Sequence, residues 1–418
     1  STRSYDQVHL SPWITWPTVH RGVNFDKHKI QNLGQDLSYA NKKFPTIWES
    51  LSKNGKRVGI YGSLHTSLMP DSLQNYDFYV PDPFSEHSQC FPRKLEPIQD
   101  FQLKLSRKSS RNVDSSIGGI SAISSLIELF RNGLRIKTFF RVIKQLFIEK
   151  INRSRLSRRR ILQTGINFDM FLKLLKTKKP NFSTFFTNHV ASSMHRYWEA
   201  AYPEDFKIQS QSYKWRENFK NEINEAMYLT EDLLNDLLVY SESRPFCEIW
   251  VCSSMGQSAV DGYEAIEKQL VIKDPFLFIK SLNLDESQFT IRPTMMPRFT
   301  FVSSHLKNIK DLSLKLKKLK INGEEIEQMI SSNTLTIRLM HWNKEPKIEF
   351  NNTIVKIENI GLEMIKINDK SGTSAYHVPE GILMISGKDS SRYVDKGEIP
   401  THEIKELIED SLLTKKSV

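Results

Sequence analysis

Cysteine is scarce in this sequence, and long apolar runs are absent. The 418 residues include three cysteines, Cys90, Cys247 and Cys252, and no two of them form a CxxC pair. This usage favours a reducing compartment and argues against a structural disulfide framework. No apolar run reaches the length that spans a bilayer, and residues 1–20 have neither the basic start nor the apolar stretch of a secretory signal. These absences predict a soluble, cytoplasmic protein.

The sequence also shows no internal repeat and no DNA- or RNA-binding motif. Hydrophobic residues make up 39% and aromatic residues 11% of the chain, which argues against disorder. A chain of this length suits one large α/β domain with an inserted subdomain as well as it suits two or three separate domains.

The positive charge is concentrated in one segment. The net charge is +11, but residues 101–180 hold 19 Lys and Arg against 4 Asp and Glu, a balance of +15 that leaves −4 for the rest. Apolar residues recur there at helical spacing, which predicts a basic α-helical insertion. Because buried unpaired charge is costly, we expect Arg153 to Arg160 to be exposed. This composition fits a basic face exposed to solvent. It also fits a surface that binds anionic membranes or another polyanion.

Elsewhere the chain repeats a helix, a glycine and a strand, the pattern of parallel α/β sheets. We expect a mostly parallel sheet with helices on both faces, containing strands at 57–62, 182–187, 246–252 and 381–386. The expected division of the chain is residues 1–100, α/β core; 101–180, basic helical insertion; 181–287, core continued; 288–370, small α+β subdomain; and 371–418, the last core strand and helix.

The stretch from Ser11 to Gly22 places a hydroxyl residue between two aromatic residues, just before a proline. Pro17 restricts the backbone, so we expect Thr15 and Trp16 at the end of an extended piece. A threonine displayed in this way can act as a nucleophile if a metal ion or a base assists its deprotonation. A packing turn rich in Trp and Pro is the alternative.

Further reactive groups are adjacent to the predicted strands. His189 and His195 follow strand 182–187, Ser254 follows strand 246–252, and His377 precedes strand 381–386. Sites in open α/β sheets form outside the carboxyl ends of the strands, so these positions are candidates to converge with Thr15. A histidine taken alone is more often a structural residue.

In this order the motifs resemble the alkaline phosphatase superfamily, most closely its branch of type I phosphodiesterases and nucleotide pyrophosphatases. The resemblance rests on Thr15-Trp16-Pro17 with Gly22 and His28, on residues 47–62, on His195, on strand 246–252 ending in Ser-Ser-Met-Gly, on His377 with Pro379-Glu380-Gly381, and on Pro400-Thr401. It implies an alkaline-phosphatase-like fold, with residues 101–180 outside the match. It also implies a two-metal centre, usually zinc, with Thr15 as nucleophile and with His195 and His377 as ligands of the first metal.

Three positions depart from the family pattern. Ala191 occupies the place of a carboxylate ligand, and Ser254 and Met255 occupy the place of an Asp-His pair. The resemblance therefore implies at most one metal ion. His189 is close enough in sequence to serve as a third ligand beside His195 and His377, and imidazole suits zinc. A metal-free site with a histidine as base is the other alternative.

Two functions follow. In the first, the chain is a hydrolase or transferase of small phosphoric or sulfuric esters, acting through Thr15. Arg21, Arg196, Asn188 and Ser254 are then the candidate substrate-binding residues. In the second, the chain is a catalytically degenerate member of the fold that binds an anionic ligand, a partner or a membrane surface.

Overall fold

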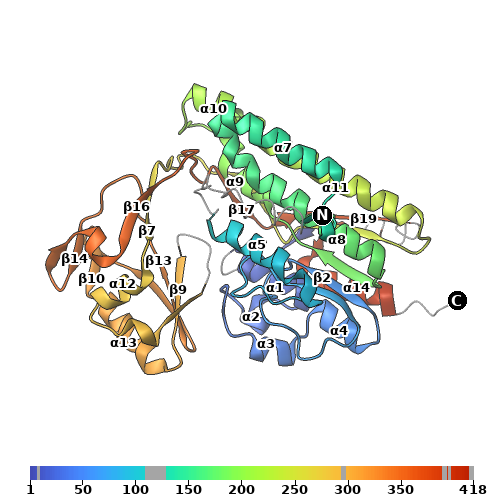
Figure 1. Cartoon of the computed structure of the whole chain (residues 1–418), viewed down its shortest axis with the longest axis horizontal. Helices are drawn as coiled ribbons and strands as arrows, with labels where there is room; N and C mark the ends of the chain where they lie inside the picture. The colour runs from blue at the N-terminus through green and yellow to red at the C-terminus, as the bar shows by residue number, and fades with distance from the viewer. Residues whose placement is uncertain (7–9, 109–128, 293–297, 388–392, 394–396, 414–418) are drawn as a thin grey trace.

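The structure is a computed structural model of residues 1–418, and it describes residues 1–6, 10–108, 129–292, 298–387, 393 and 397–413. Figure 1 shows a large lobe that contains both ends of the chain and a smaller lobe built mainly from strands. The mixed α/β class expected from the sequence is confirmed. Among the described helices, none combines the length and the apolar character needed to cross a membrane.

A parallel sheet forms the centre of the large lobe. Strand β2 (Val58–Tyr61) lies between β3 (Tyr76–Val80) and β4 (Phe182–Phe185), and both neighbours run parallel to it. All four residues of β2 are buried, as expected of a central parallel strand. Gly59 has no room for a side chain, because a Cβ atom there would lie 2.3 Å from the ring of Phe78.

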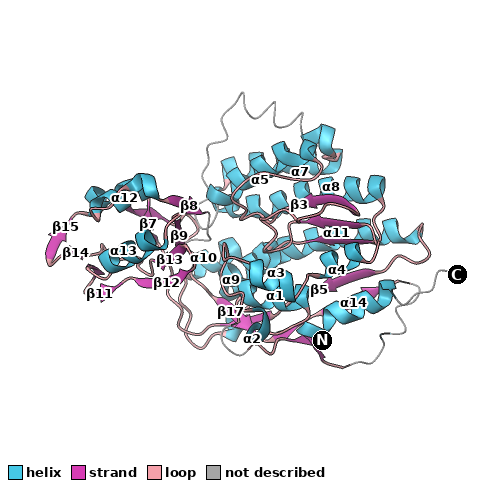
Figure 2. Cartoon of the chain, turned by 90° about the horizontal axis from the view of Figure 1, so that it is seen from below, coloured by secondary structure: helices cyan, strands magenta, loops and turns pink. Residues whose placement is uncertain are grey.

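Helices cover both faces of this sheet. On one face, Phe168, Met170 and Phe171 of α8 (Arg159–Lys178) pack against Tyr61 and Phe78. On the other face, α4 (Ile47–Lys53) and α14 (Ile404–Leu413) supply the packing residues. Figure 2 shows β3 between these helical layers. The prediction of helices on both faces is confirmed, and part of segment 101–180 contributes to the core.

The other two predicted strands do not join the parallel sheet. Strand β5 (Ile249–Cys252) pairs antiparallel with β19 (Leu383–Ser386), and β6 (Gly256–Ala259) pairs antiparallel with β17 (Ala375–Val378). The prediction of a parallel sheet through all four strands is therefore wrong for these two. Residues 249–259 run in one direction past a partner segment that returns from the small lobe in the opposite direction. The spacing of apolar residues does not encode that return path.

Ion pairs join α7 (Ile136–Ile151) and α11 (Glu222–Glu242) to the arginine run at 153–160, and this group is called the helical layer below. Glu222 of α11 contacts both Arg155 and Arg158, and Arg159 pairs with Glu149 of α7. These three arginines are half-buried, so the prediction that the whole run is exposed is wrong. The reason is that carboxylates remote in sequence compensate the charge that burial would otherwise penalise.

The remaining α-helices and one short sheet complete the described part of the large lobe. The helices are α1 (Pro12–Arg21), α2 (Phe25–His28), α3 (Ser38–Lys43), α5 (Glu96–Lys108), α9 (His189–Ala201) and α10 (Tyr213–Phe219). In the short sheet, β1 (Thr2–Arg3) pairs parallel with β20 (Ile399–Pro400) and antiparallel with β18 (Glu380–Gly381).

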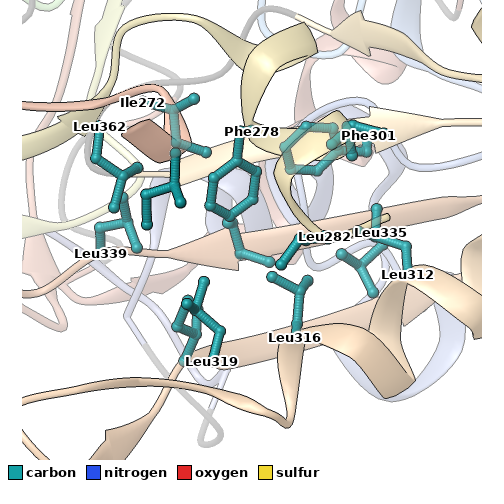
Figure 3. Packing of buried hydrophobic residues seen from close by; sticks show 14 of the residues in the cluster. Ile272, Phe278, Leu282, Phe301, Leu312, Leu316, Leu319, Leu335, Leu339 and Leu362 are labelled. Atoms are coloured by element: carbon teal, nitrogen blue, oxygen red, sulfur yellow. The ribbon is translucent and has the colours of Figure 1, made fainter. Parts of the chain in front are cut away.

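The small lobe has its own hydrophobic core, which begins at Leu270 and therefore ahead of residue 288. Phe278 and Phe301 stack at its centre, as Figure 3 shows. Its helices are α12 (Pro275–Ser281) and α13 (Leu306–Leu316). Its strands are β7 (Lys268–Ile272), β8 (Thr290–Arg292), β9 (Arg298–Val302), β10 (Leu319–Ile321), β11 (Glu324–Glu325), β12 (Glu327–Ser331), β13 (Thr334–Arg338), β14 (Ile348–Phe350), β15 (Thr353–Val355) and β16 (Leu362–Lys366).

Candidate functional site

Helix α1 lies at the carboxyl ends of the parallel strands. His65 follows β2, Phe84 follows β3 and Phe186 follows β4, and each of these residues contacts a tryptophan of α1. Ser11 caps the helix, Pro12 occupies its first turn, and Gly22 ends it with φ +68°. Thr15 is therefore helical, and the prediction that it ends an extended piece is wrong. The helix starts at Ser11-Pro12. The sequence prediction placed the structural break at Pro17 and therefore missed this start.

The hydroxyl of Thr15 is fully enclosed by protein. Its Oγ1 lies 2.8 Å from Oγ of Ser254 and 3.1 Å from the carbonyl oxygen of Ser11, to which it can donate. The sulfur of Met255 lies at 4.0 Å. The structure thus brings Ser254 and Met255 to Thr15. A hydroxyl whose proton is engaged by a backbone carbonyl, and which has no exposed surface, is not poised as a nucleophile.

His195 and His377 form a close pair. Their Nε2 atoms lie 3.1 Å apart, with His195 on α9 and His377 on β17. Each Nδ1 atom contacts a backbone carbonyl oxygen, that of Ala375 at 2.6 Å and that of Leu10 at 2.7 Å. The Leu10 carbonyl immediately precedes the cap of α1. The pair therefore lies beside the start of the helix that carries Thr15.

These contacts determine the tautomers. A carbonyl oxygen only accepts hydrogen bonds, so each Nδ1 carries the proton of its ring and each Nε2 presents a lone pair. Burial lowers the pKa of His377, which favours its neutral form. Two lone pairs that face each other at 3.1 Å repel, so the arrangement is stable when both nitrogens share one cation, either a proton or a metal ion.

The pair fits a metal ion in part. Two imidazole nitrogens bound to one tetrahedral zinc ion at about 2.0–2.1 Å lie roughly 3.3 Å apart, close to the separation observed here. Backbone carbonyls on Nδ1 are typical partners of ligating histidines. Within the described residues, however, no group of three His, Cys, Asp or Glu side chains could hold a metal ion. A two-metal centre therefore does not fit, whereas an open site with two histidines does.

His189 does not join this pair. Its Nδ1 lies 2.8 Å from Thr187 Oγ1, and its Nε2 lies 3.1 Å from the Ala226 carbonyl and from the Thr230 hydroxyl. It precedes His195 by six residues, which at about 100° per residue puts the two side chains about 120° apart around α9. The three-histidine arrangement expected from sequence proximity is not formed, because the helix turns His189 towards α11.

The candidate substrate-binding arginines are engaged elsewhere. Arg21 is buried at the far end of α1 and donates to the Phe44 carbonyl at 2.6 Å and to Asn41 Oδ1 at 2.7 Å. Arg196 is buried, with Asp369 at 3.9 Å. Asn188 is exposed at the start of α9, and its side chain makes no capping bond there. Of the four candidates, Ser254 is the one in direct contact with Thr15.

A second polar chain beside α1 escaped the sequence analysis. The Ile30 amide donates to Nδ1 of His28, Nε2 of His28 lies 3.1 Å from Thr18 Oγ1, and Thr18 donates to Asp6 at 2.6 Å. Because Nδ1 of His28 accepts, its Nε2 carries the proton and donates to Thr18, which in turn donates to Asp6. The spacing of Thr18 and His28 offered no signal, because the two residues come from separate helices.

No protein-family model matches the chain, and no curated protein matches it. Among solved structures it is similar to murine ectonucleotide pyrophosphatase/phosphodiesterase 5, with 10% sequence identity and a TM-score of 0.37, over 98% of this chain and 85% of that chain. A similarity of this size carries no argument about fold or activity. The resemblance to the alkaline phosphatase superfamily therefore remains a prediction from the motifs.

Proposed function

We propose that this chain is a binding protein that holds one divalent transition metal ion on His195 and His377 and takes a phosphate- or sulfate-type anion there. The observation that carries the proposal is the pair of Nε2 atoms at 3.1 Å, with both Nδ1 atoms held by carbonyls. The two carbonyls orient both rings so that their Nε2 atoms face one shared cation.

The proposal excludes hydrolysis through Thr15. Its side chain is fully buried, and its hydroxyl is engaged by Ser11 and Ser254. Within the described residues, no histidine makes a hydrogen bond to this hydroxyl that could take up its proton. Ser254 and Met255, beside Thr15, offer no carboxylate or imidazole for a second metal ion.

The chain's own residues have a defined part in this function. His195 and His377 bind the ion, and the carbonyls of Ala375 and Leu10 fix the orientation of the two rings. A divalent ion held there would supply positive charge and open coordination positions to an anion. Both histidines are half-buried rather than fully buried.

Zinc titration by calorimetry tests the metal site. We expect one equivalent to bind to the unmodified chain, and we expect His195→Ala and His377→Ala each to weaken binding at least tenfold. His305→Ala is the matched control, because His305 is an exposed histidine in the small lobe. Substitution of zinc by cobalt adds a visible spectrum that reports on histidine ligation. Equal zinc affinity of the unmodified chain and all three variants would contradict the proposal.

An assay with chromogenic esters distinguishes a binding protein from an ester hydrolase. We expect zinc-loaded protein to bind 4-nitrophenyl phosphate or 4-nitrophenyl sulfate without releasing nitrophenol. Thr15→Val keeps the volume of the side chain and removes the hydroxyl, so it should leave ligand binding unchanged. Nitrophenol release by the unmodified chain that Thr15→Val abolishes would show that the chain is an ester hydrolase instead.

A further inference from the structure

Helix α7 presents an apolar stripe to solvent. Ile136, Phe140, Ile143, Phe147 and Ile151 recur at intervals of four, three, four and four residues, and this set is called the α7 stripe below. Ile136, Phe140, Phe147 and Ile151 are 68, 63, 64 and 89% exposed. Residues at this spacing lie on one face of a helix. Figure 1 shows α7 along the outer edge of the large lobe.

The inward face of α7 is polar, which reverses the usual arrangement. Its buried residues are Thr138, Gln145 and Glu149. Arg141 pairs with Asp232, and Lys137 pairs with Asp236, both on α11. A surface helix normally turns its apolar face to the core and its charged face to water. Here ion pairs, together with the half-buried Phe139 that packs against the core of the large lobe, hold the helix in place. The α7 stripe is left without a partner in the described chain.

The charge on this outward side has one sign. Lys144 and Lys150 are exposed on α7 beside the stripe. Glu149 is the only acidic residue of the helix, and it is buried against Arg159. The solvent side of α7 therefore carries apolar and cationic side chains and no carboxylate. This is the composition of helices that lie in the interface of anionic bilayers.

We propose that the α7 stripe docks the protein on an anionic lipid bilayer, with α7 parallel to the membrane plane. Phe140, Phe147 and Ile151 enter the boundary between headgroups and acyl chains, while Lys144 and Lys150 pair with lipid phosphates or carboxylates. A second copy of the chain fits this surface poorly, because two such faces would oppose lysine to lysine. The proposal is independent of the metal site.

Vesicle flotation with the full chain tests this docking. The probes are vesicles of phosphatidylcholine alone and of phosphatidylcholine with 30 mol% phosphatidylserine, at low and at high salt. We expect binding to the anionic vesicles at low salt, at least tenfold weaker binding to neutral vesicles, and marked weakening at high salt because the lysine contribution is screened.

Matched variants locate the surface. Phe147→Ser/Ile151→Ser removes two members of the stripe, and Phe276→Ser/Ile354→Ser makes the same replacements at exposed positions of the small lobe. We expect the first variant to lose at least tenfold in vesicle binding and the second to bind like the unmodified chain. Lys144→Gln/Lys150→Gln should weaken binding without altering the stripe. Circular dichroism checks that each variant is folded.

Three outcomes would overturn the proposal. The first is failure of the unmodified chain to bind anionic vesicles. The second is equal vesicle binding by Phe147→Ser/Ile151→Ser and by the control variant Phe276→Ser/Ile354→Ser. The third is a stable dimer in analytical ultracentrifugation that Phe147→Ser/Ile151→Ser converts to a monomer, because the stripe would then be covered by a second copy.

Discussion

The carbonyl oxygen of Trp13 accepts a hydrogen bond from Nε2 of His65 at 3.0 Å. Pro17 lies four residues after Trp13 within α1 and has no N–H group, so this carbonyl has no helical donor. Burial lowers the pKa of His65 to about 4, which keeps its ring neutral. A side chain from the end of β2 thus completes the hydrogen bonding of the helix that carries Thr15.

Replacement of His65 should therefore destabilise the protein through α1. His65→Phe retains a ring and removes the donor, which leaves the Trp13 carbonyl unpaired. We expect a loss of about 1–3 kcal/mol in the free energy of unfolding, the usual penalty for a buried unsatisfied group. Urea unfolding followed by tryptophan fluorescence measures it.

Pro17→Ala provides the control for this prediction. The substitution restores an N–H group four residues after Trp13, so His65→Phe should cost less in the Pro17→Ala background. A double-mutant cycle measures that coupling. An equal loss in both backgrounds would show that His65 acts through packing rather than through the Trp13 carbonyl.

Three buried histidines and the half-buried His65 should make the fold sensitive to acid. Burial lowers the pKa of His20 and His28 to about 3 and that of His65 and His189 to about 4. In the unfolded chain they bind protons near pH 6.5, whereas in the folded chain they do not. The stability they contribute is complete above about pH 6.5 and falls as the pH approaches 4.

One carboxyl group acts in the opposite direction. Burial raises the pKa of Asp82 to about 6, so the folded state takes up this proton first and offsets one histidine. Three net protons correspond to roughly 4 kcal/mol per pH unit. Urea unfolding at intervals between pH 7 and pH 5 tests this, with a smaller slope expected for His189→Gln and an unchanged slope for the exposed His305→Gln. A flat profile would refute the account.

Glu222 should be the most sensitive residue of the helical layer. It is almost fully buried between Arg155 and Arg158, and its contacts with Arg158 are 2.9 Å long. Glu222→Gln removes the carboxylate that pairs with Arg155 and leaves Arg158 with the exposed Glu225 alone. We expect a loss of about 3–5 kcal/mol, the range for breaking a buried ion pair. Thermal and urea unfolding measure it.

Glu225 offers a matched comparison on the same helix. It contacts Arg158 at 2.8 Å, but its side chain is 43% exposed. Glu225→Gln should cost no more than about 1 kcal/mol, because solvent screens exposed pairs. A similar cost for both substitutions would mean that the burial of Glu222 does not decide the energetics of this cluster.

Several contacts of the candidate site followed from the order of residues along the chain. The repeat of a helix, a glycine and a strand predicted the strand at 57–62, which the structure shows as β2. The grouping of Thr15 with Ser254, and of His195 with His377, was also anticipated. Ser254 follows the carboxyl end of β5 and meets Thr15, although β5 pairs antiparallel with β19.

Other features depended on which segments meet in the folded chain. The antiparallel pairing of β5 with β19 reflects the return path from the small lobe. Glu222 turns the arginine run into a half-buried cluster, although it lies more than 60 residues further along the chain.

The α/β class and the basic character of segment 101–180 could be predicted from residue order alone. The burial of Thr15, the contact of His189 with α11 and the outward turn of the α7 stripe became known from the folded chain. The physical reason is the range of the forces involved. Caps and periodicity act within a few residues, whereas burial and the pairing of charges depend on neighbours that only the folded chain supplies.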